Sequence, residues 1–323
     1  MNSLLRVENL QMHYFTSKGA VRAIDSINFD VMPGETLGLV GESGCGKTSL
    51  GTSILRMPTP PGRYVGGKIL LKGNDIIPLP EKDVRRDIRW AKISMVFQGA
   101  MNCLTPVYTI GKQMLETLHE HSEMQHSDAE NLIKEYLGYV GLPPEIMGRY
   151  PHELSGGMKQ RAVIATALFL KPSLVILDEP TTALDVIVQS QIINLLKKLK
   201  AQFNLSFIFI THDLALEAEI ADRICVMYAG KIVELGSNER IYGLQGPAHP
   251  YTERLLAATP RLFKKVEKLQ FIPGTPPDLI HPPTGCRFHP RCHKAFERCR
   301  EEEPPLVEIE SGHFSACWLN HKG

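Results

Sequence analysis

Short, uninterrupted apolar runs alternate along the chain with longer amphipathic stretches, and this alternation predicts the class of fold. Three such runs are Thr36–Val40, Leu174–Leu177 and Ser206–Ile210. Short runs without polar positions are typical of strands that are buried on both faces. Helical patterns occur at Gly157–Leu170 and Val186–Phe203. Because strands that alternate with helices form a parallel sheet covered by helices, we expect an α/β fold.

The rest of the first 244 residues predicts further strands and helices. Leu4–Val7 and Ala23–Val31 predict strands ahead of the first buried run, with a turn at Pro33–Gly34. Residues 113–140 have a helical pattern that is interrupted by the polar stretch His119–Asp128. We therefore expect one large domain over residues 1–244.

After Leu244 the composition changes, and prolines become frequent. The segment 245–323 is too poor in regular apolar pattern to build an ordinary core, so it predicts a separate, irregular extension. Four of the seven cysteines fall in its last 40 residues and could stabilise the segment by joining separate parts of it. In a reducing cytosol, clustered cysteines favour a metal site over disulfides.

Composition limits the kind of partner that the chain can have. The 323 residues are 43% hydrophobic and 22% charged, which is ordinary for a globular protein. The net charge of +1 creates no field that would recruit nucleic acid, and we expect no nucleic-acid partner. The longest clean apolar run, Ala162–Leu170, is far shorter than a membrane span, and Met1–Leu10 lacks the pattern of a signal peptide. We therefore expect a cytoplasmic protein, which would need integral partners to serve a membrane.

The segment Gly41–Thr48 matches the phosphate-loop pattern G-x-x-x-x-G-K-[ST] between a predicted strand and a predicted helix. Its glycines let backbone N–H groups converge on phosphate oxygens, and the helix N-terminus adds partial positive charge. Lys47 is suited to reach the β- and γ-phosphates of ATP, and the Thr48 hydroxyl is suited to ligate Mg²⁺. The residues that we expect to bind the nucleotide here are Gly41, Ser43, Gly44, Cys45, Gly46, Lys47, Thr48 and Ser49.

Polar side chains follow the other buried runs. Asp178 and Glu179 end the second run, where ligands of α/β sheets gather. Asp178 is expected on the Mg²⁺ side, and Glu179 is expected to polarise the attacking water. Taken alone, the pair would more simply cap the next helix, but the phosphate loop favours catalysis. His212 could contact the γ-phosphate and Gln98 could sense Mg²⁺ or the attacking water, although either residue alone would be unremarkable.

A second anion site is predicted at Leu154–Gln160. Ser155, Gly156 and Gly157 can form a helix N-terminus that binds phosphate. Because the chain already has one phosphate loop, this second site suggests a second nucleotide or one that is shared between two chains.

Together these motifs resemble those of ABC-type ATPases. The order fits throughout: the Walker A motif at 41–48, the Q-loop at Gln98, the signature at 154–158, the Walker B motif at 174–179, the D-loop at Ala183–Asp185 and the switch at His212. The resemblance implies a RecA-like core, an antiparallel β subdomain and a helical subdomain at about 100–170. It also implies a head-to-tail dimer that encloses ATP, with Asp185 beside the nucleotide. Tyr14 occupies the position of an aromatic that stacks on adenine, although an ordinary strand aromatic would look the same.

Stretches outside the catalytic motifs resemble the ATPase subunits of oligopeptide/dipeptide importers. These are Phe97–Pro106, His249–Thr252 with Leu255–Ala258, and Ile272–Pro277 running into Gly285–Phe288. One departure is Gly99, where the family commonly has an acidic residue. The resemblance implies ATP hydrolysis at the cytoplasmic face of the membrane. The implied partners are two integral membrane permease subunits, a second ATPase subunit that is a paralogue and, indirectly, an extracellular solute-binding protein.

Alternative functions differ in how well they fit. The import of oligosaccharides or nickel is one alternative, because relatives in the same subfamily carry out these functions. A soluble ABC ATPase of DNA repair or translation would typically carry a coiled-coil insertion or tandem domains, and the chain has one set of motifs. A non-catalytic binding module would show a degenerate Glu179, His212 or signature, and all are intact.

The four C-terminal cysteines, Cys286, Cys292, Cys299 and Cys317, are spaced C-x5-C-x6-C-x17-C. Zinc knuckles usually have C-x2–4-C pairs, yet four thiolates can hold either Zn²⁺ or a [4Fe–4S] cluster. The spacing leaves this choice open, and the nearby histidines His289, His293 and His313 could replace a ligand. The resemblance favours a [4Fe–4S] cluster with a structural role, with zinc as the alternative and unpaired thiols third.

Overall fold

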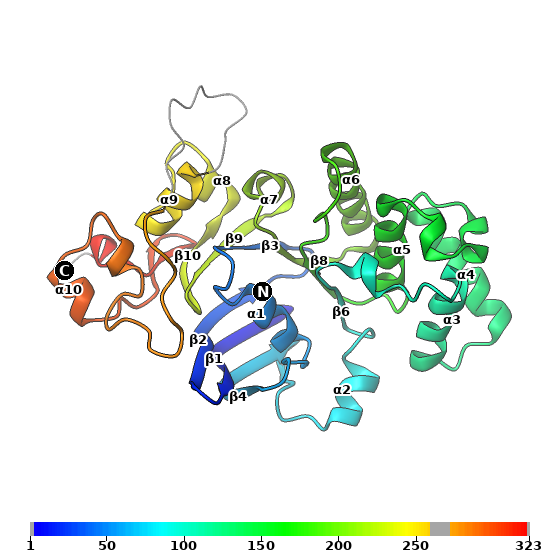
Figure 1. The fold of residues 1–323 in the computed structure, drawn as a ribbon, viewed down its shortest axis with the longest axis horizontal. Coiled ribbons are helices and arrows are strands. Elements are labelled where there is room, and N and C mark those ends of the chain that lie inside the picture. Colours follow the sequence, from blue (N-terminus) through cyan, green and yellow to red (C-terminus); the bar gives the residue numbers. More distant parts are fainter. Residues whose placement is uncertain (1–2, 259–271, 322–323) are drawn as a thin grey trace. The chain divides into compact units, whose positions relative to one another are not determined.

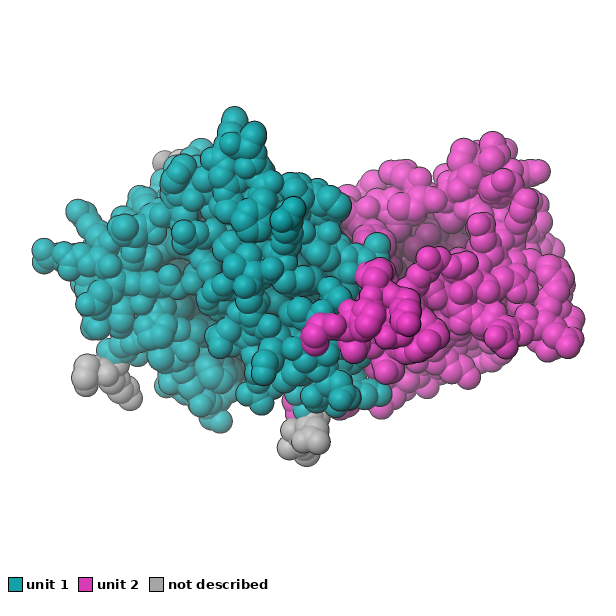
Figure 2. All heavy atoms as spheres, turned by 90° about the horizontal axis from the view of Figure 1, so that it is seen from below, with its two compact units in different colours: residues 1–31, 36–77, 210–323 teal, residues 32–35, 78–209 magenta. Residues whose placement is uncertain are grey.

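The computed structural model describes residues 3–258 and 272–321 (Figure 1). The predicted extension 245–323 therefore includes residues 259–271, which lie outside the described part. Contacts divide the chain into two compact units, which are coloured separately in Figure 2. Unit 1 comprises residues 1–31, 36–77 and 210–323, and unit 2 comprises residues 32–35 and 78–209.

Unit 1 contains an antiparallel sheet with the strand order β2-β1-β4-β5. Its strands are β1 (Leu5–Thr16), β2 (Gly19–Val31), β4 (Gly62–Leu71) and β5 (Asn74–Asp75). The predicted strands at Leu4–Val7 and Ala23–Val31 are confirmed but are longer than expected. The extra residues form the more exposed end of the β1–β2 hairpin, where the apolar pattern is sparse.

Unit 1 also contributes five strands in the order β11-β12-β10-β9-β3. They are β3 (Thr36–Val40), β9 (Arg223–Tyr228), β10 (Lys231–Ser237), β11 (Val307–Glu310) and β12 (His313–Ser315). β3 pairs in parallel with β9, and β9 and β10 form an antiparallel hairpin. The main helices of this unit are α1 (Lys47–Ile54), α7 (Leu214–Ile220), α8 (Asn238–Tyr242) and α9 (Pro250–Ala257).

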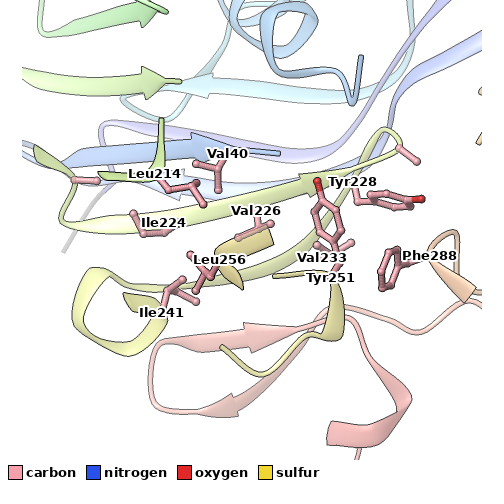
Figure 3. Packing of buried hydrophobic residues seen from close by; sticks show 12 residues of the cluster. Val40, Leu214, Ile224, Val226, Tyr228, Val233, Ile241, Tyr251, Leu256 and Phe288 are labelled. Carbon is pink, nitrogen blue, oxygen red and sulfur yellow. The ribbon is translucent and has the colours of Figure 1, made fainter. Parts of the chain in front are cut away.

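The C-terminal segment groups with unit 1 and shares its core, and its separation from residues 1–244 as a domain of its own stays a prediction. β12 pairs with β10 through Glu234–Ser315 and Leu235–Phe314. Tyr251, Leu256 and Phe288 are buried in one cluster with side chains of β9 and β10 (Figure 3). The short helices η4 (His289–Arg291), α10 (Glu297–Glu301) and η5 (Trp318–Asn320) complete the segment. Strand pairing and shared apolar burial thus attach it to the domain.

The structure does not support the metal site that was expected to stabilise the C-terminal segment. Among the residues that are described, no group of three or more His, Cys, Asp or Glu side chains is placed to hold a metal ion.

Unit 2 is built on parallel strands in the order β8-β7-β6. They are β6 (Ile93–Val96), β7 (Leu174–Asp178) and β8 (Ser206–Ile210), and all their residues are buried. The helices are α2 (Glu81–Asp87), α3 (Ile110–His121), α4 (His126–Tyr139), α5 (Gly156–Leu168) and α6 (Val186–Phe203), with 3₁₀ turns η1 (Ala100–Cys103), η2 (Pro144–Gly148) and η3 (Pro151–Glu153). The helical pattern at 113–140 corresponds to α3 and α4, and the break between them is shorter than predicted. No helix in the described ranges has the length and hydropathy needed to span a bilayer.

Candidate nucleotide site

The phosphate loop follows the fully buried strand β3 and leads into α1, as its pattern predicts. Gly41 and Gly46 have φ angles of 150° and 110°, which residues other than glycine rarely adopt. A Cβ on Gly41 would lie 2.2 Å from the carbonyl oxygen of Met227, and one on Gly46 would lie 2.3 Å from that of Ala23. Glycine is therefore required at both positions to hold the loop in this shape.

Lys47 is directed back onto the loop that precedes it. Its buried Nζ donates to the carbonyl oxygens of Gly41, at 2.7 Å, and of Glu42, at 3.1 Å. The ammonium is therefore held within the loop, where it can neutralise phosphate oxygens. The thiol of Cys45, a residue of the same loop, is buried, and burial raises its pKa, so this side chain is neutral.

Tyr14 lies on β1 in the same unit, and its hydroxyl is 2.9 Å from Ser49 Oγ on α1. The hydrogen bond fixes the tyrosine ring beside the helix that carries the phosphate loop. The stacking of this ring on adenine stays a prediction. His212 is exposed, also belongs to unit 1, and lies between β8 and the N-cap of α7, Asp213.

In unit 2, the structure brings Gln98 and Glu179 together. Gln98 Nε2 donates to Glu179 Oε2 over 2.9 Å, and Thr182 Oγ1 donates to the same oxygen over 2.9 Å. Asp178 is buried at the end of β7, with 1% of its surface exposed. Glu179 has a φ angle of 49°, in the left-handed region that non-glycine residues rarely adopt. The hydrogen bonds from Gln98 and Thr182 hold its carboxylate.

The signature segment forms a helix N-terminus. Ser155 is the N-cap of α5, and its Oγ accepts a hydrogen bond from the N–H of Met158 over 3.3 Å. A Cβ on Gly156 would lie 3.1 Å from the side chain of Leu184, and one on Gly157 would lie 2.8 Å from that of Val188. The glycines therefore let the D-loop region pack closely against this helix start, while Ser155 stays exposed.

Asp185 is the N-cap of α6, and its Oδ1 accepts from the N–H of Val188 over 3.0 Å. The next two side chains, Val186 and Ile187, are 77% and 72% exposed. Apolar side chains that are this exposed beside the D-loop suit a protein interface better than solvent.

Gly99 has a φ angle of 66°, and a Cβ there would have ordinary contact with Asn102. Space is therefore available for the acidic residue that the family commonly has, and asparagine or aspartate tolerates this conformation better than other side chains. The departure at Gly99 is compatible with the same loop.

The four C-terminal cysteines line one small cavity together with His249, Phe288 and Trp318. Burial raises the pKa of the Cys286 thiol to about 12 and that of Cys317 to about 11. The backbone N–H groups of Phe288, Lys294 and Leu319 oppose the effect of burial on the pKa of Cys286, Cys292 and Cys317, respectively. The predicted grouping of the cysteines is thus present, although the sulfurs do not form a metal-binding arrangement in the described residues.

Sequence reasoning missed several side chains that contact the phosphate loop or the strand before it. Tyr251 and Arg291 bind Glu42, and the fully buried Glu217 lies against Gly38 of β3. Burial raises the pKa of Glu217 well above its usual value, and Tyr242 donates to it over 2.8 Å. No local pattern marks these residues, because the contacts join positions that are far apart in sequence.

Comparisons with known proteins agree with the site. A family model described as "ABC transporter" matches residues 24–182, and one described as "Oligopeptide/dipeptide transporter, C-terminal region" matches 233–299. The oligopeptide transport ATP-binding protein OppD of Bacillus subtilis is 45% identical over 98% of this chain and 89% of its own length. The dipeptide transport ATP-binding protein DppD of Escherichia coli is 42% identical over 98% and 96%, respectively.

Among solved structures, the dimeric ATP-binding cassette MJ0796 bound to ADP and Pi aligns with a TM-score of 0.64 and 25% identity, over 72% of this chain and 98% of that one. The phosphate loop, the Walker B carboxylates and the signature thus occur in an ATPase of the ABC transporter class. Within this class, the chain belongs to the family of oligopeptide and dipeptide transport ATP-binding proteins.

Proposed function

We propose that this chain hydrolyses ATP to drive the uptake of dipeptides or oligopeptides. The observation that carries the proposal is the similarity to peptide transport proteins over nearly the whole chain, including the C-terminal region that is specific to that group. The alternative substrates within this subfamily are oligosaccharides or nickel.

The nucleotide motifs have separate roles in this proposal. ATP with Mg²⁺ supplies the phosphoanhydride that is cleaved. Lys47 would neutralise phosphate oxygens, and Thr48 and the buried Asp178 would hold Mg²⁺. Glu179 accepts the proton of the attacking water as general base, with its carboxylate held by Gln98 and Thr182.

Gln98 and His212 assist this chemistry. The hydrogen bond from Gln98 to Glu179 supports a role in orienting the base and in sensing Mg²⁺ or water. His212 supplies a contact to the γ-phosphate, and Tyr14 supplies a face for adenine.

We further infer that two ATPase subunits pair head to tail, the second being a paralogue. Ser155, Gly156 and Gly157 would then contact the γ-phosphate that is held by the other subunit's loop. The exposed helix start and the exposed Val186 and Ile187 support this interface, and the similar cassette MJ0796 is a dimer.

The permease subunits would dock on the segment Gln98–Tyr108. Val107 is 70% exposed and Tyr108 is 41% exposed, which suits an apolar contact with a helix of the permease. The side chain of Gln113 fixes this surface, because it binds the backbone of Thr105 and Tyr108. Docking would place the chain at the cytoplasmic face of the membrane, with an extracellular solute-binding protein as an indirect partner.

A residue exchange at the general base tests the transport role. In cells whose only copy is the Glu179→Gln variant, we expect the uptake of a labelled dipeptide to be lost, because the amide cannot take a proton. The matched control is Glu145→Gln, which changes an exposed glutamate of the same unit. Normal dipeptide uptake together with the loss of oligosaccharide or nickel uptake would instead support one of the alternative substrates.

We also propose that the segment 245–323 functions as a C-terminal extension of an ATPase domain at 1–244, with a helical subdomain at about 100–170. We propose that its four cysteines hold a [4Fe–4S] cluster, with zinc as the alternative. The shared cavity supports this, since it brings four potential thiolate ligands together. The cluster would stabilise the segment.

Metal analysis of anaerobically purified protein tests this proposal. We expect iron, acid-labile sulfide and visible absorption, all of which are lost in Cys299→Ser and retained in Cys103→Ser, which changes an exposed cysteine outside the cavity. A colourless protein with stoichiometric zinc would show that the alternative is correct.

A further inference from the structure

Arg291 connects the cysteine segment to the phosphate loop. It ends η4, directly before Cys292, and 5% of its side chain is exposed. Its Nη1 donates to Glu42 Oε2 over 2.6 Å, and its Nη2 donates to Glu42 Oε1 over 2.9 Å. Glu42 is the second residue of the phosphate loop, so a two-pronged ion pair joins the loop to a segment 249 residues away.

A second contact holds the backbone of the same glutamate. The N–H of Glu42 donates to the hydroxyl of Tyr251 over 2.8 Å. The ring of Tyr251 packs against Tyr228 and Phe288, with centroid separations of 4.6 and 5.3 Å (Figure 3). Arg291 Nη1 also donates to the Tyr228 hydroxyl over 3.2 Å. Both the side chain and the backbone of Glu42 are therefore fixed by residues outside the loop.

The guanidinium of Arg291 is itself held on its other side. Its Nε donates to the carbonyl oxygen of Pro273 over 2.8 Å, and its Nη2 lies 3.4 Å from that of Gly274. These contacts leave the charged group little freedom to follow a moving loop. Arg291 therefore acts as a fixed point against which Glu42 is positioned.

The position of Glu42 matters for phosphate binding. Its carbonyl oxygen accepts from Lys47 Nζ, so the orientation of this peptide helps to place the ammonium. Its carboxylate is also a negative charge within a loop that binds a triphosphate, and such a charge would repel the ligand unless it is neutralised. The ion pair with Arg291 supplies the neutralisation and holds the carboxylate in a fixed direction.

We propose that Arg291 is a positioning residue for ATP binding. It preforms the phosphate loop through Glu42, and it makes ATP affinity depend on the folding of the C-terminal cysteine segment. The proposal rests on ATP binding by the loop and is independent of which metal the cysteines hold.

The test measures the dissociation constant for ATP of the full-length chain and of its variants. The variants are Arg291→Gln, Glu42→Gln and the double variant. The matched control is Arg240→Gln, because Arg240 forms another two-pronged pair between a helix of unit 1 and the C-terminal segment, with distances of 3.1 and 3.4 Å to Glu310. This pair does not include a residue of the phosphate loop.

We expect Arg291→Gln to weaken ATP binding about tenfold, because it exposes the triphosphate to an uncompensated carboxylate. The double variant is expected to regain most of the affinity, since the repelling charge is then absent. Arg240→Gln is expected to bind ATP as the unmodified chain does. A purely structural role would not produce recovery in the double variant.

Equal ATP affinities for Arg291→Gln and Arg240→Gln would overturn the proposal, as would a double variant that binds ATP no better than Arg291→Gln. If Arg291→Gln does not fold, Arg291→Met with and without Glu42→Gln replaces it, because methionine has a long, flexible side chain without a charge. Weaker binding by Arg291→Met with recovery in its double variant would support the proposal, and unchanged binding would overturn it. Failure of the unmodified chain to bind ATP would count against the proposed function instead.

Discussion

At the scale of single residues, burial decides which ionisable groups carry charge near the C-terminal segment. His249 is the N-cap of α9, and its Nδ1 accepts from the N–H of Tyr251 over 3.0 Å. Burial lowers the pKa of its imidazole from 6.5 to about 4, against the opposing effect of Glu234. The histidine is therefore neutral in the folded chain at pH values where an exposed histidine would be protonated.

This difference predicts acid-sensitive stability. Between pH 6.5 and 4 the unfolded chain binds a proton at His249 and the folded chain does not, so stability is lost as the pH falls. The loss is on the order of 3 kcal/mol over this range. His249→Asn, which retains a capping side chain, is expected to flatten the pH dependence of the free energy of unfolding, measured with denaturant. His281→Asn, at a histidine that is 83% exposed, is the control, and equal slopes for both variants would contradict the prediction.

Residues with a local motif could be predicted from the sequence, whereas residues that act across long separations could not. Lys47, Glu179 and Ser155 were predicted from their neighbours along the chain, and each lies at the element end where it was expected. Arg291 is one of many basic residues near the cysteines, and only the folded chain shows that it binds Glu42. Which charged residues form an ion pair depends on tertiary contacts, and residue type and spacing along the chain do not specify these contacts.

At the scale of elements, the phosphate loop depends on two kinds of glycine. Gly44 has a φ angle of 79°, and a Cβ there would have no atom within 4 Å. Gly46 has a φ angle of 110°, and its Cβ would collide with the backbone of β2. Alanine at Gly44 therefore introduces only backbone strain. Alanine at Gly46 adds a collision with backbone atoms, which no change of a side-chain conformation can relieve.

The two alanine variants are expected to differ in stability without nucleotide. Gly44→Ala should lower the free energy of unfolding by about 1 kcal/mol, which is the cost of the left-handed conformation. Gly46→Ala should lower it by about 3 kcal/mol or more, because β2 must also shift. Denaturant titration of the two variants side by side measures this difference. An equal loss would show that the contact with β2 is easily relieved.

The elements of the C-terminal segment were the hardest to predict. Buried strands such as β7 are recognisable because all their positions are apolar except the last, Asp178, which belongs to the candidate site. β11 has alternating exposure and β12 is only three residues long, so neither has a distinctive pattern. They form because β10 offers an edge for pairing, which is a property of the assembled sheet.

At the scale of the whole molecule, the proposed head-to-tail dimer assigns two complementary parts of a nucleotide site to each chain. The phosphate loop binds ATP, while the signature helix start would serve a second chain. A single chain is therefore expected to bind ATP but to hydrolyse it slowly, and the rate per chain should increase with the concentration of the added paralogous subunit as dimers form. The amount of ATP bound per chain should stay constant over the same range.

Ser155→Arg provides the test of this division of labour. Arginine at the exposed N-cap would block the approach of a second chain's γ-phosphate, and the substitution leaves the residues of the chain's own phosphate loop unchanged. We expect this variant to bind ATP normally and to lose the rise in hydrolysis with concentration, as measured by phosphate release. Ser127→Arg, at an exposed serine in the first turn of α4, is the matched control and should keep the rise. If Ser155→Arg hydrolyses ATP as the control does, the signature is not shared between chains, and the phosphate loop would have to complete its site within one chain.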